Sequence, residues 1–521
     1  MFTIRMKRML KTRIGRQKIL KMLYQATTIV LGCHPDATVL SSYFEDKITL
    51  IKNFMYLLRT GPGSLDYSPE LLPLDVRLLA CQCLEAIVGS RDSSSTPIFA
   101  RYPWIVQDLG LNRGQYMGLL PCLVRSMTSY LVSLDTPSTN TTSNSSGSGS
   151  SGTTGAEESK MDIVTLSHSH DSSISTSNHN ETAEEREIRL LWIENVFMLL
   201  IAIINISASL PALTDNGLIS AVLLVLEREN LYNREGANMF VEIMSVEILE
   251  GAVTSHSPAM TAFKEKGGME IVIDRLHREL VHCLVDCPPP VVDTPMTVVR
   301  GSNGTLPAAS SILIQEFFSL LTSVLQEDRS HSTDREQWYK LPALTEAIRL
   351  ILANAHIVGS LILSPAISLL AEIINSDPAP PTILSHMLNT GVAKGALRVL
   401  TGLSLDEGTT STSVSAPSTR PPSQDLIYSS DLMLSMGCLM SSLSLTKDGS
   451  ELITTISPFK TIFGIFYDPR NVYPQSRVIM SDLPNMLGTN LEELARHYPV
   501  YATPMLTELV SAMQKIADLA E

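Results

Sequence analysis

The chain has 521 residues, of which 44% are hydrophobic and only 6% aromatic, and its net charge is −14. This length exceeds a single compact core, so it requires several domains or one long solenoid. The low aromatic content favours helix-on-helix packing over a β-sandwich, and the negative charge argues against general binding of nucleic acid through its phosphates. The seven cysteines lack the spacing of a disulfide framework and fit a reducing compartment.

Residues 1–134 alternate helix-like blocks with short turns and are predicted to form a first helical domain. Residues 1–35 contain eight Lys or Arg and no Asp or Glu, which is also typical of mitochondrial transit peptides. A strongly apolar helix follows directly and a serine-rich spacer is missing, so we favour a first solenoid helix with a basic outer face. Cys81 and Cys83 lie in the helix-like stretch RLLACQCLEAI, where buried thiols behave as small hydrophobes.

Residues 135–187 are predicted to be a low-complexity linker. The stretch TPSTNTTSNSSGSGSSGTTG within it has too little apolar surface to offset the entropy of ordering. His168 and His170 lie in this polar tract and are predicted to be solvated rather than metal ligands. The linker is also a candidate for phosphorylation.

Residues 188–521 are predicted to form a second helical domain, with polar loops near 286–308 and 404–425. Its segment Asn195–Thr214 has no charged residue and is nominally long enough to cross a membrane. Polar residues and a proline interrupt the segment, and its apolar block ends at Ile204. We therefore expect a buried helix and no membrane partner, with a membrane-anchored protein as the alternative.

The stretch MTAFKEKGGMEIVIDRLHREL joins two amphipathic patterns through Gly267 and Gly268. A phosphate cradle would need a preceding strand and a richer glycine set, such as G-x-G-x-x-G. Apolar residues at helical spacing on both sides predict instead a helix, a tight glycine turn and a second helix.

The same sequence pattern occurs three times, with an apolar residue four positions before a glycine and apolar residues five, six and nine positions after it. The three sets are Leu213, Gly217, Val222, Leu223 and Leu226; Phe263, Gly267, Val272, Ile273 and Leu276; and Met387, Gly391, Ala396, Leu397 and Leu400. The glycines are 50 and 124 residues apart, compatible with one and about three units of the roughly 40–47 residues of HEAT or armadillo repeats. Coincidence among leucine-rich helices is the alternative. The predicted fold is all-α, an armadillo/HEAT-like helical solenoid with disordered polar inserts.

The sequence contains no P-loop, G-x-S-x-G elbow, H-E-x-x-H motif or kinase signature set. Cys283 and Cys287 are four residues apart, but neither this pair nor Cys81 and Cys83 has a second ligand pair at zinc spacing. We therefore predict no catalytic, cofactor-binding or metal-binding residue and no cofactor. A solenoid offers a long surface for other proteins, so binding is the expected activity.

Trp104, Trp192 and Trp338 are candidates for hot spots in such an interface. Packing in the core or between repeats is the commoner role of tryptophan, and it is the one we expect. The sequence reaches Glu521 within a helical pattern and without a stop signal, which leads us to expect a chain that continues in a longer protein.

Several blocks of the sequence resemble the amino-terminal region of the giant HECT-type E3 ubiquitin ligases. These Tom-like and UPL-like enzymes carry two consecutive domains of unknown function on an armadillo-like scaffold. The resemblance is carried by LPLDVRLLACQCLEAIVGSRD and GLLPCLVRSMTSYL in the first domain, and by LLWIENVFMLLIAIINISASLPALTDNGLISAVLLVLE, FKEKGGMEIVIDRLHREL and MSDLPNMLGTNLEELARHYPVYATPMLTELVSAM in the second. The blocks occur in family order, and the sequence departs from the family in its three polar inserts.

The resemblance implies a role in protein ubiquitination, as a non-catalytic scaffold that recruits or orients substrates in the cytoplasm, with the nucleus as a second compartment. The family's catalytic part is a carboxy-terminal HECT domain with a thioester-forming cysteine, and no position here matches it. The expected partners are ubiquitination substrates and other parts of the same ligase. The alternative is a stand-alone helical-solenoid adaptor in trafficking or transport.

Overall fold

A computed structural model describes residues 74–88, 183–206, 209–227, 239–286, 306–327, 340–376, 382–402, 428–468 and 483–520. Throughout these ranges the regular structure is helical, and no strand occurs in them. The predicted all-α class is therefore confirmed.

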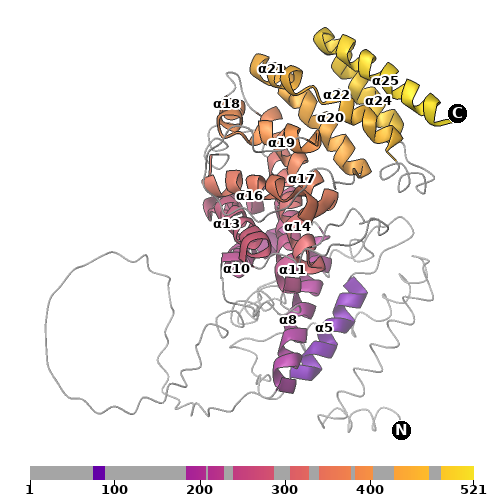
Figure 1. Cartoon of the computed structure of the whole chain (residues 1–521). Coiled ribbons are helices and arrows are strands. Elements are labelled where there is room, and N and C mark those ends of the chain that lie inside the picture. Colours follow the sequence, from indigo (N-terminus) through magenta and orange to yellow (C-terminus); the bar gives the residue numbers. More distant parts are fainter. Residues whose placement is uncertain are drawn as a thin grey trace, which may run out of the picture.

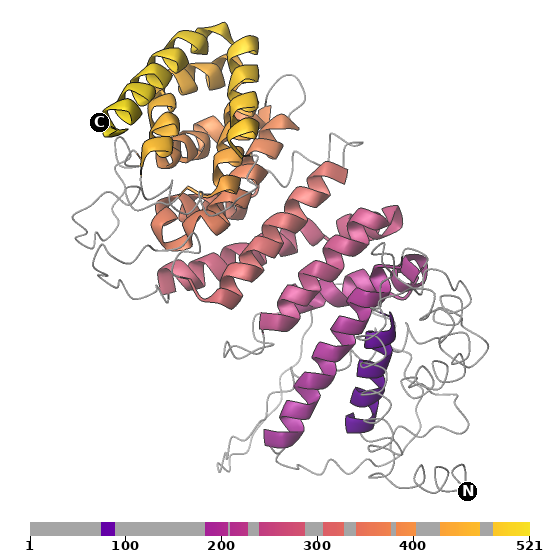
Figure 2. The same ribbon diagram turned by 90° about the vertical axis from the view of Figure 1, so that its right-hand side faces the viewer.

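The longer helices stack side by side into one layer (Figure 2). They are α5 (Leu74–Val88), α8 (Ala183–Ile204), α11 (Met239–Ser255), α14 (Ala308–Glu327), α17 (Ala355–Asn375), α20 (Ser430–Ser444) and α24 (Leu483–His497). Each packs on the one before it, so this long-helix layer grows in sequence order.

A second layer lies beside the long helices, to their left in Figure 1. It consists of α10 (Leu218–Glu227), α13 (Gly268–Val281), α16 (Pro342–Ala353) and α19 (Val392–Leu400), each packed on the next. Short helices lead into three of them, namely α9 (Leu210–Asp215), α12 (Ser257–Glu265) and α18 (Thr382–Asn389). The recurring unit of a long, a short and a second-layer helix is that of the predicted solenoid.

The carboxy-terminal part contains α21 (Lys447–Ile456), α22 (Phe459–Gly464) and α25 (Ala502–Ala520). A π-helical turn, His282–Asp286, follows α13, and single 3₁₀ turns occupy Ile465–Tyr467 and Pro499–Tyr501. Helix α25 packs on α22, so the stacking of helices extends to this end of the described chain.

The recurring glycine pattern forms the turn between each short helix and its second-layer helix. Gly217, Gly267 and Gly391 have φ of 79°, 67° and 76°, a left-handed conformation that glycine adopts without steric cost. All twelve apolar residues of the three sets are at most 2% exposed. A Cβ on the neighbouring Gly268 would lie 2.4 Å from the ring of Phe263, so this second glycine lets α12 and α13 pack closely. The predicted repeat is confirmed.

A further copy of this turn contains a serine instead of a glycine. Ser457 joins α21 to α22 with φ of 52°, and in the described part of the chain it is the only non-glycine residue with positive φ. Ile453 lies four residues before it and Ile462 five residues after it, and both are buried. The glycine pattern in the sequence does not include this copy, although its apolar spacing matches.

The three predicted polar inserts lie outside the described residues except at their edges, where α8 begins at Ala183 and α14 at Ala308. The segments between α13 and α14 and between α19 and α20 add different numbers of residues to the repeat, which explains why the sequence shows no strict period. The division into domains at 134 and 188 stays a prediction.

Segment Asn195–Thr214 is not one continuous helix, because α8 ends at Ile204 and α9 begins at Leu210. The α8 part contributes Val196, Phe197 and other apolar side chains to the core. Helices α14 and α17 are long and apolar enough to cross a membrane, but more than half of each is buried inside the packing. Helices at the centre of a solenoid are apolar on most sides for that reason.

The turn conformation leads to a test with two opposite substitutions. Gly391→Ala should lower the melting temperature, because a left-handed backbone costs an L residue about 1–2 kcal/mol. A Cβ at Gly391 meets no atom within 4 Å, so the effect would be purely conformational. Ser457→Gly should raise the melting temperature, because it removes a conformational cost of comparable size from the folded state. Thermal unfolding followed by circular dichroism measures both, and shifts of equal sign would contradict this account.

Candidate interaction surface

A groove with a volume of about 460 Å³ opens between α14 and α17, beside the start of α20. Residues four apart lie on one face of a helix, and polar residues recur at that spacing on both walls. They are Gln315, Ser319 and Ser323 on α14, and Ser360, Ser364 and Ser368 on α17. We refer to these two sets as the α14 ladder and the α17 ladder.

Hydroxyl hydrogen bonds connect the ladders to neighbouring helices. On one side, Ser319 and Ser323 donate to the Glu250 carboxylate of α11 at 2.8 and 2.7 Å. On the other side, the hydroxyl of Ser435 on α20 lies 2.9 and 2.8 Å from the hydroxyls of the last two serines of the α17 ladder. Four consecutive long helices therefore meet at the groove through small polar groups.

The long helices around the groove carry only negative charge. The sequences of α11, α14, α17 and α20 contain no Lys or Arg. Their carboxylates outside the buried network described below include Glu247, Glu250, Glu316, Glu372 and Asp431. The second layer and its short helices carry the cations, for example Lys264, Arg278 and Arg349. The four long helices around the groove are therefore without Lys or Arg, whereas the second-layer helices beside them carry both signs of charge.

The carboxyl groups of α11 and α14 are crowded together. Burial raises the pKa of Glu247, and the charge of Glu250 raises it further. Burial also raises the pKa of Glu316, with added repulsion from Glu250 and Glu247. Like charges held close together in a partly desolvated place attract cations, so the groove favours a positively charged partner.

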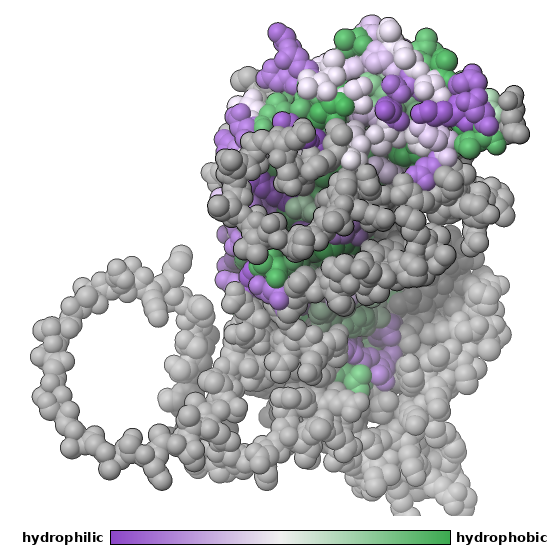
Figure 3. Space-filling model, in the orientation of Figure 1, coloured by the Kyte–Doolittle hydropathy of each residue, from purple (hydrophilic) through white to green (hydrophobic). Residues whose placement is uncertain are grey.

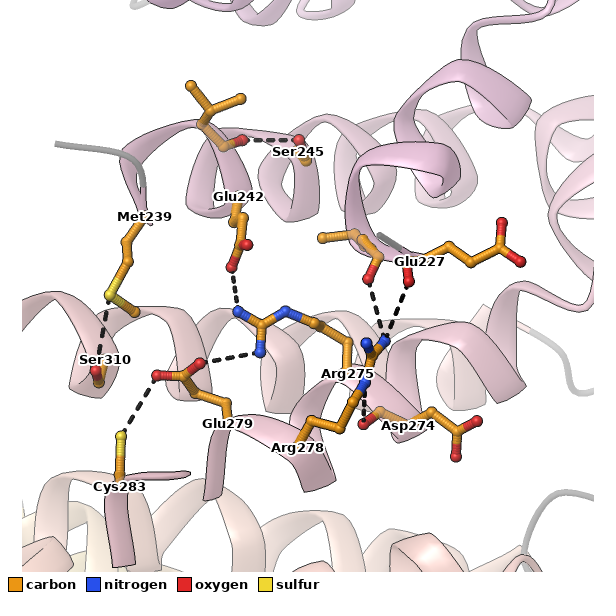
Figure 4. Close-up of polar contacts among 12 residues, drawn as sticks. Glu227, Met239, Glu242, Ser245, Asp274, Arg275, Arg278, Glu279, Cys283 and Ser310 are labelled. Carbon is orange, nitrogen blue, oxygen red and sulfur yellow. Dashed lines mark hydrogen bonds and ion pairs between the residues drawn. The ribbon is translucent and has the colours of Figure 1, made fainter. Parts of the chain in front are cut away.

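A second charged cluster is buried between α11, α13 and α14 (Figure 4). Arg275 of α13 forms ion pairs with Glu242 of α11 and, at 2.9 Å, with Glu279 one turn along its own helix. The Cys283 thiol donates to Glu279 at 3.4 Å, and Ser310 of α14 also bonds Glu279. The three charged residues are at most 8% exposed, so this buried network holds the helices together and is not a binding site.

The charges within this buried network determine the protonation states of Glu279 and Arg275. Burial acts to raise the pKa of Glu279, but the Arg275 guanidinium and hydrogen bonds from Arg275, Cys283 and Ser310 hold the pKa below its ordinary value of 4.5. Burial likewise acts to lower the pKa of Arg275, and Glu242 and Glu279 raise it above the ordinary value. Arg275 and Glu279 are therefore both ionised at neutral pH.

The described residues among those singled out in the sequence have packing roles. Trp192 is 4% exposed, and the Arg77 guanidinium lies 4.6 Å from the centre of its ring, which joins α5 to α8. Cys81 is buried and donates to the Asn195 carbonyl at 3.3 Å, and Cys283 bonds Glu279. The side chains of six other singled-out residues lie outside the described set, namely Cys83, Trp104, His168, His170, Cys287 and Trp338.

Helix α25 presents an apolar stripe to solvent. Exposed apolar residues recur along it at helical spacing, namely Leu506, Leu509, Val510, Met513, Ile516 and Leu519. Figure 3 shows hydrophobic surface interspersed with hydrophilic surface over these carboxy-terminal helices, at the top of the view. Exposed apolar residues gathered on one face of a helix mark contact sites for other helices or proteins.

Breaking the buried network should destabilise the chain strongly. Arg275→Met leaves Glu242 and Glu279 buried without a counter-charge, an effect that costs about 3–5 kcal/mol in comparable sites. The triple variant Arg275→Met, Glu242→Leu, Glu279→Leu should recover most of that loss, since it removes all three charges. Thermal melts of both variants test this, and a triple variant less stable than Arg275→Met would contradict the assignment.

The network also predicts loss of stability in acid. The folded-state pKa of Glu279 lies below the unfolded value, so the carboxylate stabilises the fold above about pH 4.5 and this contribution is lost as the pH falls through the folded pKa. Glu279→Gln should therefore flatten the acid limb of a plot of melting temperature against pH. Glu265→Gln, on the exposed face of α12, serves as the control and should leave that limb unchanged.

The comparisons with known proteins agree with this description. A family model described as Domain of Unknown Function (DUF913) matches residues 243–521, which include the groove and most of the buried network. The chain is 23% identical over 273 residues to the E3 ubiquitin-protein ligase HUWE1 of Mus musculus, covering 50% of this chain and 6% of that protein. It is 20% identical over 337 residues to the E3 ubiquitin-protein ligase UPL2 of Arabidopsis thaliana, covering 62% and 8%.

A third relative, the E3 ubiquitin-protein ligase ptr1 of Schizosaccharomyces pombe, is 20% identical over 290 residues, which cover 54% of this chain and 8% of that protein. The chain thus spans 6–8% of the length of these relatives. The predicted resemblance to the giant ubiquitin ligases is confirmed. Because the family model matches more than half of its length, the chain belongs to the DUF913 family.

Proposed function

We propose that this chain is a non-catalytic, protein-binding part of a ubiquitin ligase, which recruits substrates or orients them for ubiquitin transfer. Its partners are then substrate proteins and other parts of the same ligase. Its place of action is the cytoplasm, with the nucleus as a second compartment.

The observation that carries the proposal is the DUF913 match together with three relatives that are all E3 ubiquitin-protein ligases. The stacked helices support a binding role, because a solenoid presents one continuous surface built from many repeats. The groove between α14 and α17 and the apolar stripe on α25 are two surfaces on which such binding could occur.

The test separates ubiquitin transfer by the purified chain from transfer by the native assembly. The recombinant 521-residue chain, incubated with E1, a panel of E2 enzymes, ATP and ubiquitin, should form no ubiquitin adduct that a thiol reductant releases. Native protein captured with an antibody against residues 190–280 should ubiquitinate itself or bound proteins in the same mixture.

Each result can contradict a different part of the proposal. A thiol-sensitive adduct on the recombinant chain, lost on substitution of one cysteine by serine, would show that the chain itself is catalytic. Captured native protein without any ubiquitin transfer, under conditions in which a known ligase is active, would remove the role in ubiquitination.

A further inference from the structure

We infer that the groove between α14 and α17 binds a short extended polypeptide segment rich in Lys and Arg. This inference deepens the proposed recruiting role and rests on it, since it names the chemistry of the recruited protein. Three features meet at this groove: the two polar ladders, polar groups without hydrogen-bond partners, and surrounding charge that is only negative.

The groove wall contains one polar side-chain group that has no hydrogen-bond partner among the described residues. Nε2 of Gln315, in the α14 ladder, is shielded from solvent and makes no hydrogen bond. Buried polar groups normally find partners, so the Gln315 amide provides a donor for a bound molecule.

The opposite wall offers an acceptor. Pro365 lies inside α17 and lines the groove. Proline has no backbone N–H, so the carbonyl of Leu361, four residues earlier, lacks its usual helical partner. Leu361 also lines the groove and is 38% exposed. A donor on one wall and an acceptor on the other suit the alternating N–H and C=O groups of an extended main chain.

The charge around the groove selects the side chains of that segment. Glu250 and Glu316 lie on its α11 and α14 side, and Asp431 lines it beside α20. Glu372 lies one turn beyond the end of the α17 ladder. No cation lies on the four surrounding helices. A nucleic acid would be repelled here, whereas Lys and Arg side chains would be attracted from both ends of the groove.

The experiment is a fluorescence anisotropy titration of the full 521-residue chain. The probe is a labelled 12-residue peptide of alternating Arg and Ser, and a peptide of alternating Glu and Ser is the negative control. We expect saturable binding of the basic peptide only. No binding of the basic peptide, or equal binding of both peptides, would overturn the inference.

Two matched triple variants test the location. Glu247→Gln, Glu316→Gln, Glu372→Gln should weaken binding about tenfold, from three moderate charge contacts. Glu265→Gln, Glu270→Gln, Glu451→Gln removes the same net charge from α12, α13 and α21 and should change the affinity less than twofold. Equal losses in the two variants would mean that only the overall charge attracts the peptide.

A third variant tests contact with the main chain. Gln315→Leu removes an amide with an unused donor, so it should weaken peptide binding several-fold without lowering the melting temperature. Spermine, a cation without peptide bonds, should compete poorly at equal charge concentration. If spermine competes fully and the Gln315→Leu variant binds the peptide with unchanged affinity, the groove recognises charge alone. That result would overturn the inference that it binds the peptide main chain. None of these results depends on ubiquitin transfer, so failure here is distinguishable from failure of the proposed function.

Discussion

The architecture depends on a left-handed residue at the point where each short helix meets its second-layer helix. This conformation turns the chain sharply, so that apolar residues before and after the turn face the same interior. Glycine adopts it at Gly217, Gly267 and Gly391 because it has no Cβ. The turn places the second-layer helices beside the long ones, and the long-helix layer keeps an open surface at the groove between α14 and α17.

That surface is chemically different from the rest of the molecule. The long helices must be apolar where they contact both neighbours and the second layer, and their remaining positions hold serine, threonine and carboxylates. Crowded carboxyls such as Glu247 and Glu316 make the folded state less stable than neutral residues would. Such a cost, kept beside a surface groove, is typical of functional positions, where stability and binding compete.

The sequence predicted the repeat well because its signal is local. A turn residue and four apolar positions lie within a short window, and all three predicted copies are buried as expected. Ser457 was missed because serine is not a marker of left-handed turns, even though its apolar neighbours fit. The Arg275–Glu279 pair could be expected from its spacing of four residues on a helix. Glu242 is 33 residues from Arg275 and meets it only after α11 and α13 have packed on their shared neighbours α10, α12 and α14. The polar ladders are visible as four-residue spacings, but only the stacking order brings them to one groove.

The buried network around Arg275 bears on how this chain opens and closes. In a linear stack, each helix contacts only near neighbours, so local unfolding can begin at either end and move inward. Separating α13 from α11 would break their packing on the shared neighbours α10, α12 and α14, and would also leave the Glu242 carboxylate without its counter-ion. Fraying should therefore halt at this interface. Amide hydrogens of α11 and α13 would then be the slowest to exchange with deuterium, and the repeats on either side would behave as separately cooperative units.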